Sequence, residues 1–472
     1  MSQRITFPVA GVSSESRSIR ANSQRSINLY PRPEQPGAKS QLILDSTPGL
    51  ERVAVAGDGF VRSNIVTFGA SAYVVVGRQL MRIKRNFTVS PVGSMMTASH
   101  RVSMVAGRDY LMLTDGFKGY SWDESTFASI NDPDFPARPG GCAYRDGYFV
   151  TNHLGSDTWM ISANENPTLW GALDFAAAEK MPDDAVLPVA TTGDLYLMGE
   201  ETVETYYTSN DVDFPFERYA NGTIDVGLVA AASVAETGGQ IFMLGRLKNS
   251  DPVVVMISGF QLSRLSNPDI EAVISGFTRA DDAEGFVYQQ AGNTFYELTF
   301  PEADRTFVYH VEGQMWHERK SYGMGRHRAS GYGLFNGNHL VGHCLNSSIF
   351  RMRHDVYDED GEPIERIRQT SVQHLDRRRI TVPAVEIEFE AGVGLTTGQG
   401  SDPQAMLQYS TDGGSTWSYE MWRGMGAIGE GRARCVWDKF GTAREFVFRV
   451  VVTDPVKVAI INGYADIIVR KS

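Results

Sequence analysis

The sequence has few cysteines and no long apolar run. Three cysteines, Cys142, Cys344 and Cys435, lie far apart among 472 residues and form no C-x-x-C pair. An odd number of widely spaced cysteines fits reduced, buried thiols of a protein made in the cytoplasm better than a disulfide framework. No segment approaches the roughly 18 apolar residues of a spanning helix, and the first ten residues lack the apolar core of an export signal. We therefore expect no membrane anchor, no export and no redox chemistry.

The chain also lacks an excess of positive charge. Its 44 Lys and Arg residues are outnumbered by 56 Asp and Glu residues, which gives a formal net charge of −12. This balance disfavours a protein whose affinity depends on neutralising nucleic-acid phosphates or anionic lipids. With 42% hydrophobic and 11% aromatic residues, the chain can bury more than one core. Disorder, collagen and coiled coil are excluded.

Helical periodicity is missing as well. No segment holds an apolar stripe at 3.6-residue spacing over three turns, and Pro182 stops the one candidate turn at Ala176 to Lys180. The chain instead contains short runs of β-branched and aromatic residues bounded by turn residues, such as Ala72 to Val76 and Val253 to Ile257. Such runs predict an all-β fold with little helix.

These runs recur at a regular distance. The first strand residue after a polar turn advances by 37 to 47 residues along the series Tyr73, Tyr110, Tyr148, Leu195, Ile241 and Phe286. This distance is close to the ~40–50 residues of a four-stranded propeller blade. The sequence therefore predicts a six-bladed β-propeller, with seven blades possible. A further hairpin at His339 to Val341 and Ile349 to Arg351 would close the ring with N-terminal residues or form a seventh blade.

Two flanks do not follow this spacing. Residues 1–50 are rich in Ser and Arg and contain a Pro-rich segment at Tyr30 to Gly37, which favours an extended N-terminal arm lying on another surface. Near the C-terminus, Val385 to Glu390 alternates strictly, as expected of a small β-sandwich. The predicted organisation is an extended N-terminal arm over 1–50, a β-propeller over 51–370, a linker over 371–382 and a C-terminal β-sandwich over 383–472.

The best-formed motif resembles the Asp-box of sialidase-type propellers, S-x-D-x-G-x-T-W. It consists of Ser410, Asp412, Gly414, Thr416 and Trp417. The carboxylate of such a box accepts N–H groups across a tight turn, and the tryptophan packs under the turn. Sialidases repeat the box on several blades, whereas this chain has it once and outside the repeat. We interpret it as a structural turn without a catalytic role, because a carboxylate bound in a turn is not free for proton transfer.

Two clusters of polar residues are candidates for metal sites. The first has the H-x3-H-C spacing of some zinc sites and comprises His339, His343, Cys344 and, further on, His354. The surrounding glycines and asparagines favour a hairpin with polar histidines at a blade edge. The second is the acidic run over 355–365, whose acids miss the ligand positions of a calcium loop around Gly361. We interpret this run as a solvated turn, and the sequence predicts no metal and no cofactor.

Basic residues occur in local groups. In an acidic protein such groups more often meet carboxylates of a neighbouring subunit than phosphates. The candidate contacts with another subunit or with an adaptor are Arg17, Arg20, Arg25, Arg377, Arg378 and Arg379. Nothing in the sequence assembles a nucleophile, a base and an oxyanion site, so we expect no enzymatic activity.

Two opening signatures point to a family. The segments Ser26 to Pro31 (S-I-N-L-Y-P) and Ser46 to Leu50 (S-T-P-G-L), followed by propeller-like strands and a terminal sandwich, resemble the packaged DNA stabilization proteins of short-tailed bacteriophages. The resemblance covers nearly the whole chain in architecture and length. It implies a structural virion protein: a tail hub, nozzle or tail accessory factor in which six copies form a ring below the portal and its adaptor. Such a ring extends the DNA channel and retains the packaged genome until ejection, without enzyme activity.

The resemblance also implies partners and a location. The partners are copies of the chain in a homo-hexamer, the portal adaptor, and tail fibre, spike or needle proteins, and the location is the virion tail. Duplex DNA passes through the channel without tight binding, which an acidic wall favours by like-charge repulsion. Two alternatives stay open. A sialidase-like enzyme would need a pocket on the propeller axis with several arginines and an acid, and a glycan-binding receptor module would expose aromatic residues in shallow grooves.

Overall fold

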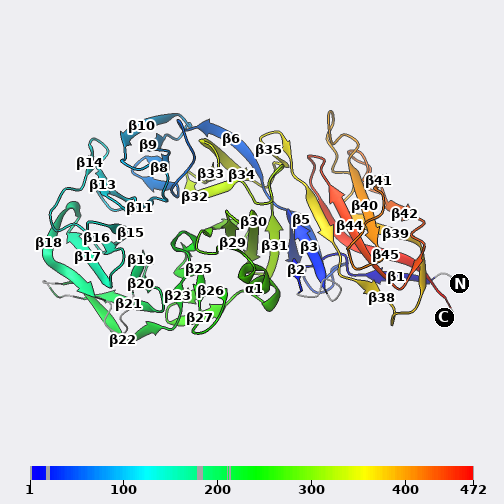
Figure 1. Ribbon diagram of the computed structural model, residues 1–472. Coiled ribbons are helices and arrows are strands. Elements are labelled where there is room, and N and C mark those ends of the chain that lie inside the picture. The colour runs from blue at the N-terminus through cyan, green and yellow to red at the C-terminus, as the bar shows by residue number, and fades with distance from the viewer. Residues whose placement is uncertain (1–2, 17–21, 178–183, 210, 212–213, 471–472) are drawn as a thin grey trace.

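Strands dominate the molecule. The computed structural model describes residues 3–16, 22–177, 184–209, 211 and 214–470. Within them, the helices are the 3-10 turn η1 (Ala231–Ser233) and the eight-residue α1 (Pro268–Ser275), which Asn267 caps. Figure 1 shows a ring of small sheets beside a layered β-domain. The predicted all-β class is confirmed.

In the described residues, six groups of antiparallel strands, each from one continuous stretch of the chain, follow one another around the ring, and they are numbered here as blades one to six. Blades one to three comprise β7 (Val66–Phe68), β8 (Ser71–Val76), β9 (Gln79–Ile83) and β10 (Val89–Ser94); β11 (Ser103–Ala106), β12 (Leu111–Thr114), β13 (Gly119–Trp122) and β14 (Phe127–Ser129); and β15 (Pro139–Arg145), β16 (Tyr148–His153), β17 (Thr158–Ala163) and β18 (Asn166–Ala177). Blades four to six comprise β19 (Ala185–Ala190), β20 (Leu195–Gly199), β21 (Val203–Thr208) and β22 (Phe216–Ile224); β23 (Gly227–Leu228), β24 (Ala235–Thr237), β25 (Gln240–Arg246), β26 (Pro252–Ser258) and β27 (Gln261–Arg264); and β28 (Glu284–Gln290), β29 (Asn293–Phe300), β30 (Arg305–His310) and β31 (Met315–Arg319).

A further sheet closes the ring. Its strands are β32 (Ala329–Phe335), β33 (Asn338–His343), β34 (Ser348–Arg353) and, from the N-terminal part of the chain, β6 (Gly49–Val55). β6 pairs antiparallel with β34, and the short β35 (Asp358–Glu359) and β36 (Glu362–Pro363) extend the other edge of β6. The predicted propeller is therefore confirmed. Six blades are made of consecutive strands, and the closing sheet, completed by N-terminal residues, takes the place of the seventh blade that the sequence allowed.

Alternating side chains hold neighbouring sheets together. In β8, Val75 shares a buried cluster with Leu113 of blade two, whereas Val74 shares another with Ile349 of the closing sheet. Successive residues of a strand point to opposite faces of its sheet, so one strand supplies apolar groups to both neighbours. Equivalent clusters join the other sheets around the ring. Burial of this apolar surface, at ~25 cal/mol per Å², is the main stabilising contribution to the ring.

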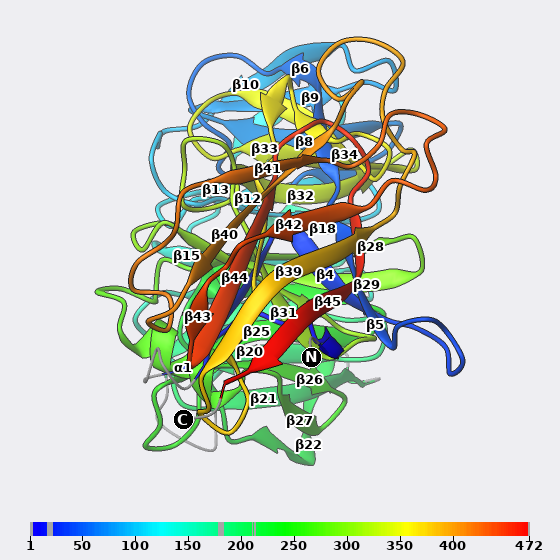
Figure 2. The same ribbon diagram turned by 90° about the vertical axis from the view of Figure 1, so that its right-hand side faces the viewer.

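The second domain is a sandwich of two sheets. One layer holds β4 (Leu29–Pro33), β5 (Leu42–Ser46), β45 (Ala459–Val469), β39 (Ile380–Phe389) and β42 (Cys435–Asp438), with β1 (Gln3–Phe7) beside β45 and β43 (Thr442–Ala443) beside β39. The other layer holds β3 (Ser23–Ile27), β37 (Arg366–Gln369), β44 (Glu445–Val452), β40 (Gln404–Ser410) and β41 (Met421–Gly424), with β2 (Ser14–Glu15) beside β3 and β38 (Gln373–His374) beside β44. Figure 2 shows this domain in front of the propeller sheets.

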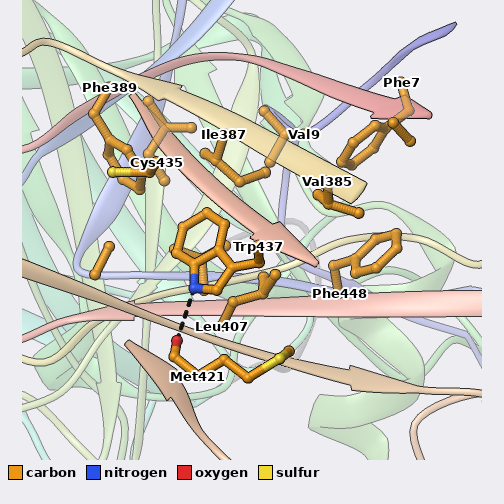
Figure 3. Close-up of a cluster of buried hydrophobic side chains, with 14 of the residues drawn as sticks. Phe7, Val9, Val385, Ile387, Phe389, Leu407, Met421, Cys435, Trp437 and Phe448 are labelled. Atoms are coloured by element: carbon orange, nitrogen blue, oxygen red, sulfur yellow. Dashed lines mark hydrogen bonds between the residues drawn. The ribbon is translucent and has the colours of Figure 1, made fainter. Parts of the chain in front are cut away.

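The sandwich core is centred on Trp437, whose side chain is fully buried. Its indole N–H donates to the carbonyl of Met421 at 2.8 Å and so ties the two layers together (Figure 3). Phe7 and Val9 from the N-terminal segment lie in the same apolar cluster. The sandwich core therefore draws on residues from both ends of the chain.

The N-terminal 50 residues differ from the expected arm. β1 pairs with β45, β4 and β5 form a hairpin within the sandwich, and β6 closes the propeller. The described part of the segment is thus built into both domains of its own chain instead of lying on another surface. Its apolar side chains are buried in the cores of these domains, which removes their surface from water. The other boundaries shift as well. β37 lies in the sandwich, although 51–370 was predicted as propeller, and residues 371–382 contain β38 and the start of β39.

Candidate functional site

The strand β3 joins the two domains in one sheet. One edge of β3 meets β31 of blade six in parallel, with Ile27 opposite Glu318, and the other edge pairs antiparallel with β37. From β37 the sheet continues to β44, β40 and β41 of the sandwich. Propeller and sandwich, predicted as separate, therefore share an 11-stranded sheet in the part of the chain that the structure describes. We call the region around β3, β31 and β37 the junction.

Asn28 fixes the crossing point of the junction. Its side-chain amide donates to the carbonyls of Lys320 and Glu365, both at 2.9 Å, and its backbone N–H donates to the carbonyl of Glu318 at 2.9 Å. The residue is 1% exposed and has a φ of 56°. Asparagine is among the few residues that adopt this left-handed conformation readily. One side chain thus ties the end of blade six to the segment that enters the sandwich.

Charged side chains surround the same crossing point. Glu318, which is 4% exposed, accepts hydrogen bonds from Arg25 and Arg305, each at 2.6 Å, and both arginines also contact Glu15. Burial alone would raise the pKa of Glu318, but Arg25 and Arg305 hold it below its usual range. Arg25, predicted to contact another subunit or the adaptor, lies instead in this network within its own chain. Arg17 and Arg20 fall outside the described residues.

Arg368 of β37 anchors the irregular part of the N-terminal segment. Its guanidinium is 1% exposed and donates to the carbonyls of Val9, Val12 and Arg25, and to the side chains of two further residues. Burial lowers the pKa of Arg368 to about 9. Carbonyls outside regular pairing need donors when they are buried, and this single side chain supplies several.

A second buried network lies inside the propeller. Glu297 is fully buried and contacts Arg319 at 3.3 Å and His327 at 2.6 Å, and the other ring nitrogen of His327 lies 3.4 Å from Glu359. Burial opposes ionisation of Glu297, but His327 and Arg319 hold its pKa below the usual range. Arg319 also donates to the carbonyl of Pro48, next to β6. Glu359 is only 2% exposed, so this residue of the acidic run does not lie in a solvated turn as predicted.

The remaining arginine candidates lie on the surface. Arg377, Arg378 and Arg379 are all exposed, just before β39, and have no ion pair with any described residue. Arg377 has a φ of 58°, which places it in a tight turn. The structure leaves these three guanidinium groups available to another molecule.

The Asp-box residues form the turn between β40 and β41. Asp412 accepts the N–H of Thr416 at 2.9 Å and the hydroxyls of Ser410 and Thr416, each at 2.6 Å. The hydroxyl of Ser410 accepts the N–H of Gly414 at 2.8 Å. Hydrogen bonds from Ser410 and then Thr416 hold the pKa of Asp412 well below its usual range. The carboxylate is therefore engaged on both oxygens by the turn itself.

Trp417, the last residue of the box, is half-buried. The guanidinium of Arg449 lies over its ring, 4.1 Å from the ring centre, and the ring lies near Gly414 of the turn. The tryptophan was expected to pack under the turn in a buried position. The ring is instead half-buried with a cation stacked over it, an arrangement that is itself stabilising.

The histidine cluster is dispersed among local partners. His339 contacts the hydroxyl of Tyr332 at 2.9 Å, and His343 accepts the N–H of Leu345 at 2.9 Å. Cys344 is half-buried, and the ring of His354 packs near Tyr30. Among the described residues, no group of three or more His, Cys, Asp or Glu side chains is arranged to hold a metal ion.

A groove of about 450 Å³ at the junction gathers several arginines and an acid. It is lined by Arg25, Ile27, Asp304, Arg305, Lys320, Met324, Gly325, Ile367, Gln369 and Arg449. The alternative of a sialidase-like enzyme would need such a pocket on the propeller axis, whereas this groove lies between blade six and the sandwich. Its arginines already take part in the fold, since Arg25 and Arg305 contact Glu318 and Arg449 stacks on Trp417.

Sequence reasoning missed the junction itself. Asn28 lies within the S-I-N-L-Y-P signature, which carried the family resemblance but received no structural role. Arg366 and Arg368 received no structural role either, although their alternation with Ile367 and Gln369 is typical of a strand. That alternation, together with the apolar Ile27 and Leu29, was the available signal.

Two family models agree with this architecture. A family model described as bacteriophage P22 Gp10, beta-propeller, matches residues 5–357, and a second, described as bacteriophage P22 Gp10, beta-sandwich, matches residues 365–468. None of the curated proteins compared with the chain matches it. Among solved structures, the Pan2 WD40 domain of Neurospora crassa aligns with 63% of this chain and 89% of its own length, at 7% identity and a TM-score of 0.40.

The order and extent of the family matches identify the family of the chain. In the described residues, no helix is long and apolar enough to cross a membrane. The two matches follow each other in chain order, include the N-terminal strands in the propeller match, and together cover nearly the whole sequence. The chain therefore belongs to the bacteriophage P22 Gp10 family and is a structural protein of the phage tail.

Proposed function

We propose that the chain is the hexameric hub, or nozzle, of a short phage tail, where it sits below the portal and adaptor and retains the packaged genome until ejection. The observation that carries this proposal is the match of both domain families, in order, over nearly the whole chain. The partners are further copies of the chain, the portal adaptor, and tail fibre, spike or needle proteins.

The junction suits such a role. The wall of a channel that retains a pressurised genome needs domains that do not move against each other. The strand β3 places both domains of this chain in one sheet. Its buried charge pairs resist separation, because removal of one partner leaves the other charge buried and unpaired. The net charge of −12 disfavours binding of DNA phosphates to the channel wall during ejection, because like charges repel each other.

The protein acts without catalysis in this proposal. The alternatives, a sialidase-like enzyme or a glycan-binding module, drew on the Asp-box. That box lies in the sandwich and not on a blade, and its carboxylate is engaged by the turn. Turnover of a fluorogenic glycoside by the purified chain would support the alternative of a sialidase-like enzyme.

Particles that lack the protein test the proposal. They are expected to package DNA and then lose it, and wild-type tails imaged along their axis are expected to show a sixfold ring of this chain. Full DNA retention without the protein would contradict the proposal. So would tight, salt-sensitive binding of free duplex DNA by the purified chain, since a sliding channel should not hold phosphates.

A further inference from the structure

Five exposed arginines gather at one end of the sandwich. We call them the arginine patch: Arg377, Arg378, Arg379, Arg444 and Arg470. Backbone pairing holds them together. Ile380 lies opposite Val469 on one side and Ala443 on the other, so Arg379, Arg470 and Arg444 occupy adjacent register positions. In addition, Arg444 donates to the carbonyl of Arg377 at 2.7 Å, and the N–H of Arg470 donates to the carbonyl of Arg379 at 2.9 Å.

The charges of the arginine patch are not neutralised by acids within the described part of the chain. None of the five arginines has an ion pair with a described residue, whereas Arg25, Arg305 and Arg319 are all paired. The exposed Asp376 and the half-buried Glu445 are the nearby acids along the chain. Like charges held side by side repel each other unless an anionic partner covers them.

Negative charge is concentrated in the other domain, the propeller. Residues 139–264, which form blades three to five, contain 6 Lys and Arg against 17 Asp and Glu, whereas residues 365–472 contain 14 against 13. Four exposed acids, Asp184, Glu200, Asp225 and Asp251, have no ion pair with a described residue. We call them the acidic face.

Strand pairing places the acidic face on one side of the ring. Asp184 precedes β19 and Glu200 follows β20, two strand ends that are paired through Ala185 and Gly199. Asp225 follows β22, and Asp251 precedes β26, next to the paired end of β25. Figure 1 shows blade four at the end of the molecule away from the C-terminus. The patch therefore cannot meet this face within one chain.

We propose that the arginine patch of one copy docks on the acidic face of the next copy around the ring. The inference rests on the proposed hexamer and names its contact. A closed ring built from identical copies in head-to-tail order needs two different, complementary surfaces on each chain. The patch and the face satisfy this need by charge, they lie in different domains, and both are exposed.

Charge reversal tests the contact in assembled tails. We expect Arg377→Glu/Arg378→Glu/Arg379→Glu, and separately Asp184→Arg/Glu200→Arg/Asp225→Arg, to lower incorporation of the chain by at least about tenfold, because like charges then face each other. A chain that carries all six changes regains complementary charges and should return to near wild-type incorporation. The matched control is Arg78→Glu/Lys84→Glu/Arg85→Glu, which reverses exposed basic residues of blade one and should leave incorporation unchanged.

A second measurement does not depend on how the reversed variants fold. Arg378→Lys keeps the charge and supplies an amine, and a zero-length carbodiimide reagent should then join it, in assembled tails, to a carboxylate of the acidic face of another copy. Cross-links only to the adaptor, or normal incorporation of the patch variant, would overturn the inference. So would a patch variant that assembles normally but loses duplex DNA affinity, since the patch would then be a phosphate contact. If wild-type tails show no sixfold ring, the proposed function fails instead.

Discussion

Blades one to five and the junction hold their strands together by opposite means. In blades one to four, consecutive strands pair, and in blade five β23 and β24 both pair with β25; in all five, apolar side chains from alternate positions fill the space between sheets. At the junction, Ile27 lies opposite Glu318 and Ile367, partners about 300 residues away, and the contacts are buried charges and amides. The ring is locally encoded, whereas the coupling of ring and sandwich is not.

This difference teaches where the molecule is vulnerable. An apolar blade loses stability in small steps as groups are trimmed, because neighbouring side chains relax into part of the space. A buried polar junction loses it abruptly, since each missing donor leaves an acceptor without a partner. The junction should therefore respond to single changes more strongly than an exposed blade surface does.

Removal of residues 1–27 should have the largest effect. The deletion takes away β1, β3 and the core residues Phe7 and Val9, so the sandwich should lose more than about 5 kcal/mol and its unfolding should separate from that of the propeller. Calorimetry should show two transitions in place of one, with the propeller still folded. Shortening the exposed turn at residues 35–38 is the control and should leave a single transition. Unchanged coupling after the deletion would contradict the role of β3.

The next effect concerns Arg368. Arg368→Met keeps most of the volume but removes the donors to three carbonyls, of which that of Val9 is buried and the other two are partly buried, and we expect a loss of about 3–5 kcal/mol in unfolding free energy. Arg78→Met, at an exposed position of blade one, should change it by less than about 0.5 kcal/mol. Urea denaturation followed by tryptophan fluorescence measures both. Equal effects of the two substitutions would remove the distinction between blade and junction.

The contrast between blades and junction also explains how much of the structure could be predicted from the sequence. The blades were predictable because strand and partner lie within one spacing of about 40–50 residues, as at Tyr73 and Leu195. The Asp-box turn was recognisable because its hydrogen bonds are local. β3 and β37 were not, because Arg25 and Arg368 resemble surface residues and their partners across the junction are hundreds of residues away. A buried arginine carries no local mark that distinguishes it from an exposed one.

Two tryptophans of the sandwich sharpen the comparison further. Trp437 is fully buried and should cost about 3–5 kcal/mol on truncation to alanine. Trp417→Ala should cost only about 1 kcal/mol, because the half-buried ring mainly stacks against Arg449. This second value is below the loss expected for a tryptophan sealed under the turn. A melting temperature of Trp417→Ala as low as that of Trp437→Ala would show that the turn is buried after all.

The smallest effect is a dependence on pH. His317 is fully buried, and its pKa is lowered well below 6.5, first by burial and then by Arg319 and His310. The unfolded chain therefore binds this proton at a higher pH than the folded chain does. As a result, the free energy of unfolding is unaffected by His317 above about pH 6.5 and decreases as the pH drops below that value. His317→Leu should reduce the difference in melting temperature between pH 7.5 and 5.5. His100→Leu, at an exposed ring, should leave that difference unchanged.

The central claim is that β3 makes propeller and sandwich one cooperative unit, and amide hydrogen exchange of the full chain tests it most directly. The amides of β31 in blade six and of β37 and β44 in the sandwich should exchange with the same opening free energy and the same response to low concentrations of urea. Exchange in β37 and β44 at a much lower opening free energy than in β31 would contradict the claim, because the sandwich would then open while the propeller stays closed.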